Sequence, residues 1–192
     1  MKALASAAGE PPAATTAEVA SGERFLGSEL DGASMSAPTV AKLEEKVATA
    51  STLYHRVVFL VGPSSETRTE LLATVAGKHN WPVVNLGLTF SQQLLDVPRR
   101  HRAVTAPQVL ADLLHGFPGE VLVLDHIEIL FNPELAQDSV NLIQSLSRNR
   151  TLVVSWPGEH VGSRLLYAEP GHPEYYKQPI PDLMQVEMSG AA

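Results

Sequence analysis

The stretch Val57–Leu72, VVFLVGPSSETRTELL, decides the expected fold of this chain. Five apolar residues are followed by Gly62 and Pro63 and then by a polar run that opens a helical pattern. A buried strand, a glycine turn and a helix N-terminus form the usual setting for phosphate binding, because free backbone N–H groups and the helix dipole point at the anion. The stretch therefore predicts a strand–loop–helix unit with the order of a phosphate loop.

The loop departs from the standard phosphate-loop pattern G-x-x-x-x-G-K-[ST]. Gly62 and Thr69 occupy the first and last positions of the pattern, whereas Thr67 and Arg68 stand where Gly and Lys are expected. Thr67 adds a β-branched side chain, and the planar guanidinium of Arg68 is not equivalent to an ammonium group. Glu66 adds a negative charge that is unfavourable beside a phosphate. Two interpretations stay open, a nucleotide-binding loop and a plain turn between strand and helix.

Composition limits the range of functions. The chain has 192 residues, of which 44% are hydrophobic, a formal net charge of −7 and no cysteine. The negative charge argues against broad electrostatic binding to nucleic acid, although a local basic patch is not excluded by it. The lack of cysteine excludes disulfides and thiolate metal sites, and makes a reducing cytoplasm the expected location. No apolar run is long enough to predict a membrane span.

We expect one domain, over residues 38–188. Residues 1–37 are rich in Ala, Gly, Ser, Thr, Pro and Glu without sustained periodicity, which predicts a disordered leader. Residues 189–192 form a short tail. The functional part of the chain is therefore expected between these two ends.

Continuously apolar runs predict parallel strands, because strands that are buried on both faces lack the alternation of half-exposed ones. Helical segments between them imply crossover units. We therefore expect an α/β fold of the P-loop NTPase-like (AAA+/ASCE) type, with a parallel sheet of about five strands and helices on both faces. The expected strands are Val57–Val61, Val83–Leu86, Val121–Leu124, Thr151–Ser155 and a weaker edge strand, Leu183–Met188; the expected helices begin near Pro38 or span Thr69–Lys78, Ser91–Val97, Pro107–His115 and Pro133–Ser147.

An acidic residue follows the third of these strands. Asp125 stands at the strand end, where nucleotide hydrolases place the carboxylate that holds magnesium. With the hydroxyl group of Thr69 it forms a candidate metal site. Glu128, three positions later, is a weak candidate for the base that activates water. The alternative is that Asp125 only caps the following turn.

The fourth strand is expected to lie between the two strands that carry these motifs. Ser155 at its end is then a candidate for contacting a terminal phosphate. The complete candidate set is Gly62, Pro63, Ser64, Ser65, Glu66, Thr67, Arg68, Thr69 and Ser155 for ATP, Thr69 and Asp125 for magnesium, and Glu128 for catalysis.

Two segments stand apart from this candidate site. The densest basic run, Arg99–Arg102, favours a solvated loop or a partner-docking segment over a DNA contact. The segment Arg164–Leu183 is rich in Pro, Gly and Tyr and predicts an ordered loop over the sheet edge, with a binding loop as the sharper alternative.

The segments LVGPSSETRTELL, VLVLDHIEILF, TLVVSWPG and YAEPGHPEYY follow one another in an order that resembles the BrxF family, the small P-loop proteins of type 3 BREX (bacteriophage exclusion) systems. The resemblance covers about residues 38–188, and Gly62, Thr69 and Asp125 match its motifs. It implies an AAA+-like, ATP- and magnesium-binding protein of a bacterial antiviral defence complex. The partners that it implies are a large BREX ATPase, a methyltransferase and an alkaline-phosphatase-like protein.

Three functions are compatible with these observations. The first is an ATP-binding BREX subunit with weak or no hydrolysis of its own, so that ATPase activity stays open. The second is a nucleotide-independent interaction subunit on a vestigial P-loop scaffold. The third is a DNA-associated AAA+ accessory factor that uses Arg99–Arg102. Homo-oligomerisation is also open, and an arginine supplied to a neighbouring subunit would come from Arg99, Arg148, Arg150 or Arg164.

Overall fold

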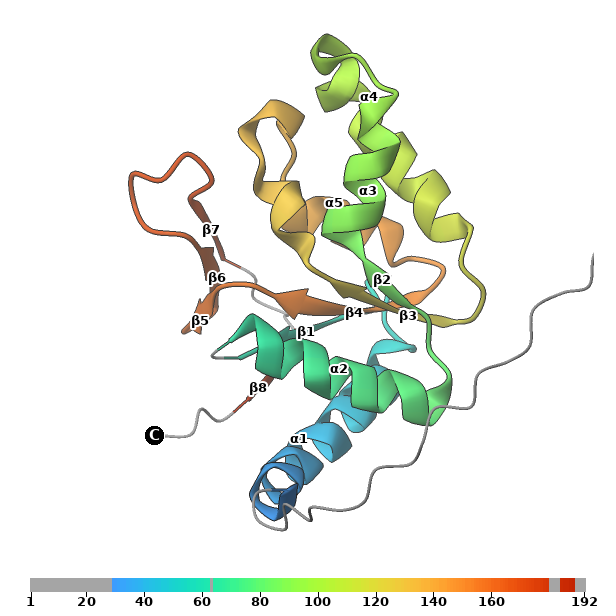
Figure 1. Cartoon of the computed structure of the whole chain (residues 1–192), viewed down its shortest axis with the longest axis vertical. Coiled ribbons are helices and arrows are strands. Elements are labelled where there is room, and N and C mark those ends of the chain that lie inside the picture. Colours follow the sequence, from blue (N-terminus) through green and yellow to red (C-terminus); the bar gives the residue numbers. More distant parts are fainter. Residues whose placement is uncertain (1–28, 63, 180–183, 189–192) are drawn as a thin grey trace, which may run out of the picture.

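The computed structural model describes residues 29–62, 64–179 and 184–188 of the chain (Figure 1). Helices and strands alternate through most of this part. The helices are α1 (Glu29–Ala50), α2 (Ser65–His79), α3 (Leu86–Leu95), α4 (Arg99–His115) and α5 (Ser139–Leu146), with the short 3-10 helices η1 (Ile127–Phe131) and η2 (Pro133–Leu135). The strands are β1 (Val57–Val61), β2 (Val83–Asn85), β3 (Val121–Asp125), β4 (Thr151–Trp156), β5 (Glu159–Val161), β6 (Arg164–Tyr167), β7 (Tyr176–Pro179) and β8 (Gln185–Glu187).

The main sheet has five parallel strands in the order β2-β3-β4-β1-β8. β4 lies between β1 and β3, as the sequence predicts, and the weak strand expected within Leu183–Met188 is the edge strand β8. Because all five strands run in one direction, their carboxyl ends meet at one edge. The residues that follow β1, β3 and β4 are therefore neighbours in space.

Helices cover both faces of this sheet (Figure 1). α1 and α2 pack on one face, against Val58 and Leu60 of β1, and α3, α4 and α5 pack on the other, against Val57, Phe59 and Val61. The alternation follows from the two-residue period of a strand. The expected α/β fold, with a five-stranded parallel sheet between helices, is confirmed.

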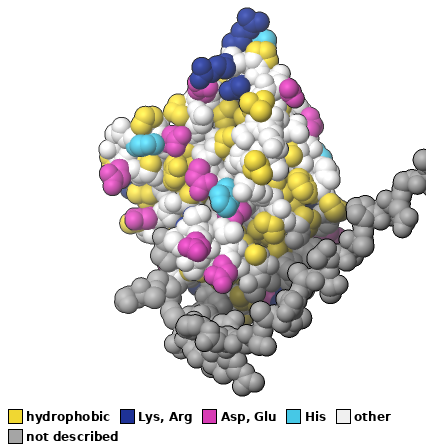
Figure 2. Space-filling view, in the orientation of Figure 1, with side chains coloured by type: hydrophobic (Ala, Val, Ile, Leu, Met, Phe, Trp, Pro, Cys, Tyr) yellow, Lys and Arg dark blue, Asp and Glu magenta, His cyan; other side chains and the backbone are white. Residues whose placement is uncertain are grey.

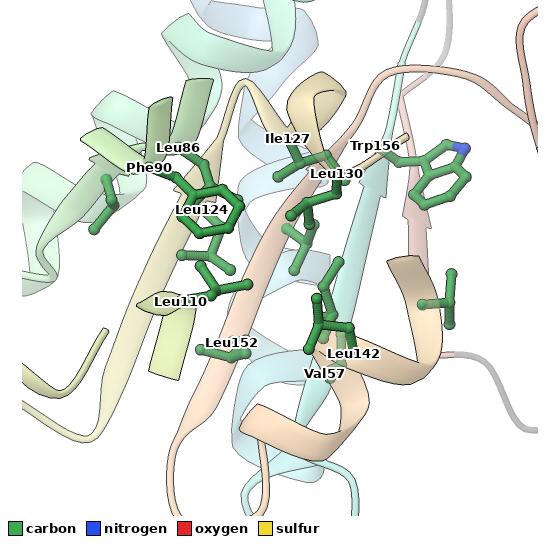
Figure 3. Close-up of a cluster of buried hydrophobic side chains, with 14 of the residues drawn as sticks. Val57, Leu86, Phe90, Leu110, Leu124, Ile127, Leu130, Leu142, Leu152 and Trp156 are labelled. Carbon is green, nitrogen blue, oxygen red and sulfur yellow. The ribbon is translucent and has the colours of Figure 1, made fainter. Parts of the chain in front are cut away.

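The larger core lies on the α3–α5 face (Figure 3). Phe90 of α3 and Leu110 of α4 pack there with Leu124 of β3 and Leu152 of β4, and all four side chains are at most 1% exposed. Burial of each such side chain contributes roughly 1.5–3 kcal/mol. The core thus anchors β3 and β4, whose ends carry Asp125 and Ser155.

A second sheet of three antiparallel strands, β5-β6-β7, follows β4. Trp156 donates a hydrogen bond from Nε1 to the carbonyl oxygen of Leu166 at 2.9 Å and packs edge-on against Phe131, which stacks on Tyr167. Gly158 admits no side chain, because a Cβ atom there would collide with the Leu166 carbonyl group. Of the ordered loop expected over Arg164–Leu183, the two ends that the structure describes are β6 and β7, residues 168–175 connect them without a strand, and residues 180–183 lie outside the described residues.

α4 begins at Arg99, whereas the sequence predicted a helix starting at Pro107. Proline within a helix leaves the carbonyl group four residues earlier without its partner. Here that carbonyl group, of Ala103, accepts a hydrogen bond from Gln137 Nε2 at 2.7 Å. A solvated loop is thus the wrong interpretation of Arg99–Arg102, which form the first turn of α4.

Two other helix starts differ from expectation. α3 begins at Leu86 rather than Ser91, because the side chain of Asn85 accepts a hydrogen bond from the Leu88 N–H group at 2.9 Å. β2 accordingly ends at Asn85. α1 begins at Glu29 rather than near Pro38. Of the leader predicted to be disordered, residues 1–28 lie outside the described residues.

The helix predicted over Pro133–Ser147 is divided into η2 and α5. Ala136 lies between them with a φ angle of 48°, a left-handed conformation that no α-helix contains. Asp138 then caps α5 by accepting a hydrogen bond from the Asn141 N–H group. None of the helices in the described part of the chain has both the length and the apolar character needed to cross a membrane.

Candidate functional site at the carboxyl edge of the sheet

The candidate site lies where the carboxyl ends of β1, β3 and β4 meet. Gly62 follows β1, Asp125 is the last residue of β3, and Ser155 is the penultimate residue of β4. Asp125 and Ser155 are only 3% and 2% exposed. α2 starts directly above this edge with Ser65, so the site combines strand ends with a helix N-terminus.

The structure brings together the two residues expected to hold magnesium. Thr69 donates a hydrogen bond from Oγ1 to Oδ2 of Asp125 at 2.6 Å, across 56 positions of sequence. The backbone N–H group of His126 donates to Asp125 Oδ1 at 2.9 Å. A hydroxyl and a carboxylate oxygen are suitable magnesium ligands, and magnesium takes its other ligands from water or phosphate. These two residues fit the metal that the sequence implies.

The described residues hold no group of three or more His, Asp or Glu side chains that could bind a metal ion. Any magnesium at Thr69 and Asp125 would therefore depend on oxygen atoms from a phosphate or from water.

Arg68 turns into the protein rather than towards solvent. Its side chain is almost fully buried, and the residue is 4% exposed. Nη1 donates to the carbonyl oxygen of Gly62 at 2.9 Å, and Nε donates to Oγ of Ser155 at 3.1 Å. The guanidinium group thus joins the end of β1 to the end of β4. Ser155, expected to contact a phosphate, is instead a partner of this arginine.

The charge on Arg68 is partly compensated from a distance. Burial lowers the pKa of its guanidinium group, while the carboxylates of Glu128 and then Asp125 raise it. Arginine still remains protonated at neutral pH. The site therefore contains a buried cation whose two hydrogen bonds go to neutral acceptors.

The expected phosphate-binding loop is helical, which corrects the sequence prediction. α2 begins at Ser65, not at Thr69, so that Ser65–Arg68 form its first turn. Ser64 is the N-cap: its Oγ accepts from the Thr67 N–H group at 3.1 Å, and its carbonyl oxygen accepts from the Arg68 N–H group at 3.2 Å. Pro63 lies outside the described residues.

This early start occupies two of the N–H groups that a phosphate loop would offer to its anion. In a phosphate loop the backbone N–H groups face the anion, whereas those of Thr67 and Arg68 are already bonded to Ser64. Without the second glycine, this segment has no residue that readily adopts the open loop conformation. Glu66, which looks unfavourable beside a phosphate, is favourable in the first turn of a helix because of the helix dipole. The residues present do not fit a bound triphosphate in this conformation.

Gly62 leaves room for two neighbouring side chains. A Cβ atom at this position would lie 2.8 Å from Sδ of Met188 and 3.0 Å from Cγ of Arg68. Met188 is held there because its N–H group donates to the Val61 carbonyl oxygen at 2.8 Å. The glycine lets the end of the edge strand and the arginine close over the end of β1.

Glu128 lies in η1 and is half-buried. Among the described residues it has no hydrogen-bond or ion-pair partner, and it acts on the site only through its charge on Arg68.

His126 is a site residue that the sequence interpretation passed over. It adopts a left-handed conformation with a φ angle of 54°, and its Nδ1 lies 3.3 Å from Asp125 Oδ2. That nitrogen is buried but is not aligned for a hydrogen bond with any described residue. The sequence signal for this position is a histidine directly after the acid at the end of β3.

Comparisons with known proteins leave the interpretation to the chain's own residues. No protein-family model matches the chain, and no curated protein matches it significantly. The contacts at the strand ends therefore carry the functional argument.

Proposed function

We propose that this chain is a nucleotide-independent interaction subunit, built on a P-loop-type scaffold, of a bacterial BREX defence assembly in the cytoplasm. One observation carries the proposal: the buried guanidinium group of Arg68 bridges Gly62 and Ser155, where a phosphate loop would hold its anion. The protein supplies its own positive group at this place. It has no need of a ligand to connect the ends of β1 and β4.

Opening the site would cost free energy. Hydrogen bonds to a charged group contribute roughly 1.5–3 kcal/mol each, and Arg68 makes two of them. A triphosphate would also have to unwind the first turn of α2, which Ser64 caps. Since each 1.4 kcal/mol is about tenfold in affinity, these costs lower the expected affinity for nucleotide by orders of magnitude.

The strand order supports the proposed scaffold, and the resemblance to the BrxF family supports the proposed assembly. The strand order, with β4 between β1 and β3, is compatible with the ASCE type of P-loop protein. The resemblance to the BrxF family supplies the defence context and the expected partners, namely a large ATPase, a methyltransferase and a phosphatase-like protein. In such an assembly the partner ATPase would supply the hydrolysis.

A second candidate function is ATP–magnesium binding with weak or no turnover. The pairing of Thr69 with Asp125 at 2.6 Å favours it, because these oxygen atoms could hold the metal. It requires Arg68 to leave its place between Gly62 and Ser155. A DNA-associated role has less support, because Arg99 and Arg102 both lie against Glu134.

Titration calorimetry with a non-hydrolysable ATP analogue and magnesium separates these candidates. We expect no saturable heat for the unmodified chain at millimolar ligand. The variant Arg68→Ala tests whether the arginine alone blocks the site, and Arg164→Ala, which removes an exposed arginine of β6, is the charge-matched control. Saturable binding by the unmodified chain that is lost in Asp125→Ala would overturn the proposal in favour of the ATP-binding subunit.

A further inference from the structure

The helical hairpin of α3 and α4 carries an exposed apolar surface at its tip. Leu95 at the end of α3 is 76% exposed, and Val104 in the second turn of α4 is 86% exposed. Leu88, 57% exposed, lies two helical turns before Leu95 on the same face of α3. Isolated exposed apolar residues are ordinary, but three on one short hairpin form a candidate interaction surface.

Basic side chains lie in the first turn of α4, close in sequence to Leu95 and Val104. Three of the chain's 14 Lys and Arg residues lie within Arg99–Arg102. Figure 2 shows dark blue side chains gathered at the top of the molecule, over this hairpin, with yellow apolar side chains beside them. Arg100 is exposed, has no ion-pair partner among the described residues, and lies one helical turn before Val104 on the same face of α4.

Internal contacts hold the basic turn in place. Glu134 of η2 accepts a hydrogen bond from Arg99 Nη2 at 2.5 Å and lies 3.9 Å from Arg102 Nη1. Arg102 also donates from Nε to the Val97 carbonyl oxygen at 3.1 Å. The first turn of α4, which carries Arg100, is therefore supported by η2 and by the segment that joins α3 to α4.

We propose that this tip, defined by Leu95, Arg100 and Val104, docks an acidic segment of a partner protein that also carries apolar side chains. The inference rests on the proposed interaction function and gives the partner its chemistry. A carboxylate of the partner would pair with Arg100, and its apolar side chains would cover Leu95 and Val104. Charge steers such contacts and apolar burial stabilises them.

The surface suits an acidic protein better than nucleic acid or a membrane. Glu134 pairs with Arg99 and lies close to Arg102, so that Arg100 is the one arginine of this turn without an ion-pair partner among the described residues, which suits a single carboxylate better than a row of phosphates. The hairpin exposes no aromatic side chain, since its one aromatic residue, Phe90, is fully buried; bases and lipid headgroup regions are commonly met by exposed aromatic rings.

Site-specific photo-crosslinking of the full chain, within cells that carry the whole defence assembly, tests the proposal. The probe is a photo-reactive amino acid placed at Val104, with Val161 of β5, 56% exposed, as the matched control position. We expect crosslinks from position 104, mapped by mass spectrometry, to one protein segment rich in Asp or Glu with apolar residues. Crosslinks to nucleic acid or lipid, to a segment without acidic residues, or in equal yield from both positions would overturn the proposal.

Charge reversal adds a second readout. Arg100→Glu in the position-104 probe chain should lower the crosslink yield at least about tenfold, whereas Arg164→Glu should leave it unchanged. An equal effect of the two reversals would overturn the role of Arg100. These readouts do not depend on nucleotide, so that ATP binding detected by calorimetry would reject the proposed function without deciding where the partner docks.

Discussion

The two halves of the candidate site differ in how closely their residues match a nucleotide-binding motif. The metal half keeps the hydroxyl group of Thr69 and the carboxylate of Asp125, which meet at 2.6 Å. The phosphate half has lost its second glycine and its lysine, and Arg68 lies buried between Gly62 and Ser155. Both halves lie at one edge of one sheet. Two neighbouring positions, Thr67 and Arg68, therefore distinguish this segment from the standard phosphate-loop pattern, while Thr69 and Asp125 of the metal half match it.

The difference between the halves has a structural reason. Thr69 and Asp125 satisfy each other's hydrogen-bonding groups without rearrangement, so this pair needs no ligand to be stable. A lysine that awaits a phosphate would be a cation without a fixed partner, whereas the planar guanidinium group of Arg68 reaches two acceptors at once. The phosphate half has become part of the protein's own packing.

The largest expected effect comes from removing the arginine. Arg68→Ala should lower the free energy of unfolding by about 3 kcal/mol, because it removes two hydrogen bonds of a charged group and leaves space around Ser155. Urea unfolding followed by circular dichroism measures it, and Arg164→Ala should change stability by less than about 0.5 kcal/mol. If Arg68→Ala is as stable as the control, the arginine does not hold the strand ends together.

The matching test in the metal half is Asp125→Ala. We expect it to lower the free energy of unfolding by about 2 kcal/mol, because the hydroxyl group of Thr69 and the N–H group of His126 lose their buried acceptor. Asp125→Asn keeps an acceptor oxygen and should cost clearly less. The same urea titration compares the two, and equal losses would mean that the carboxylate charge matters more than the hydrogen bonds.

A side chain added at Gly62 is expected to have a smaller effect on the free energy of unfolding. Gly62→Ala should lower the free energy of unfolding by about 1.5 kcal/mol, because the new Cβ atom would lie 2.8 Å from Sδ of Met188. In a double-mutant cycle, Met188→Ala should recover part of this loss. Additive effects of the two substitutions would show that the thioether is not what the alanine meets.

The smallest expected effect concerns the cap of α2. Ser64→Ala removes the acceptor of the Thr67 N–H group and should lower the free energy of unfolding by about 1 kcal/mol. Ser64→Asp keeps a capping oxygen and should leave the stability nearly unchanged. Thermal unfolding of the two variants measures the difference. If both variants unfold at the temperature of the unmodified chain, the helix start at Ser65 does not depend on this cap.

Much of the sheet could be predicted because buried parallel strands are continuously apolar. Val57–Val61 and Thr151–Ser155 carry that signal, and the meeting of Thr69 and Asp125 follows from the common edge of parallel strands. β5, β6 and β7 were missed as strands, because they are short and their residues are largely polar or partly exposed.

The closed phosphate half could not be derived from the motif. The inward turn of Arg68 depends on Ser155, which lies 87 positions away in sequence and accepts the Nε hydrogen bond. A local signal for the early helix was nevertheless present. Ser64 is a favoured N-cap residue, but aligning the segment with the phosphate-loop pattern placed the helix start at Thr69.

The most direct test of this account is a crystal structure of the unmodified chain grown with a millimolar non-hydrolysable ATP analogue and magnesium. The account predicts that Arg68 still donates its hydrogen bonds to Gly62 and Ser155, with α2 starting at Ser65 and no triphosphate beside it. A triphosphate bound between Gly62 and Thr69, with Arg68 displaced and the first turn of α2 unwound, would contradict it.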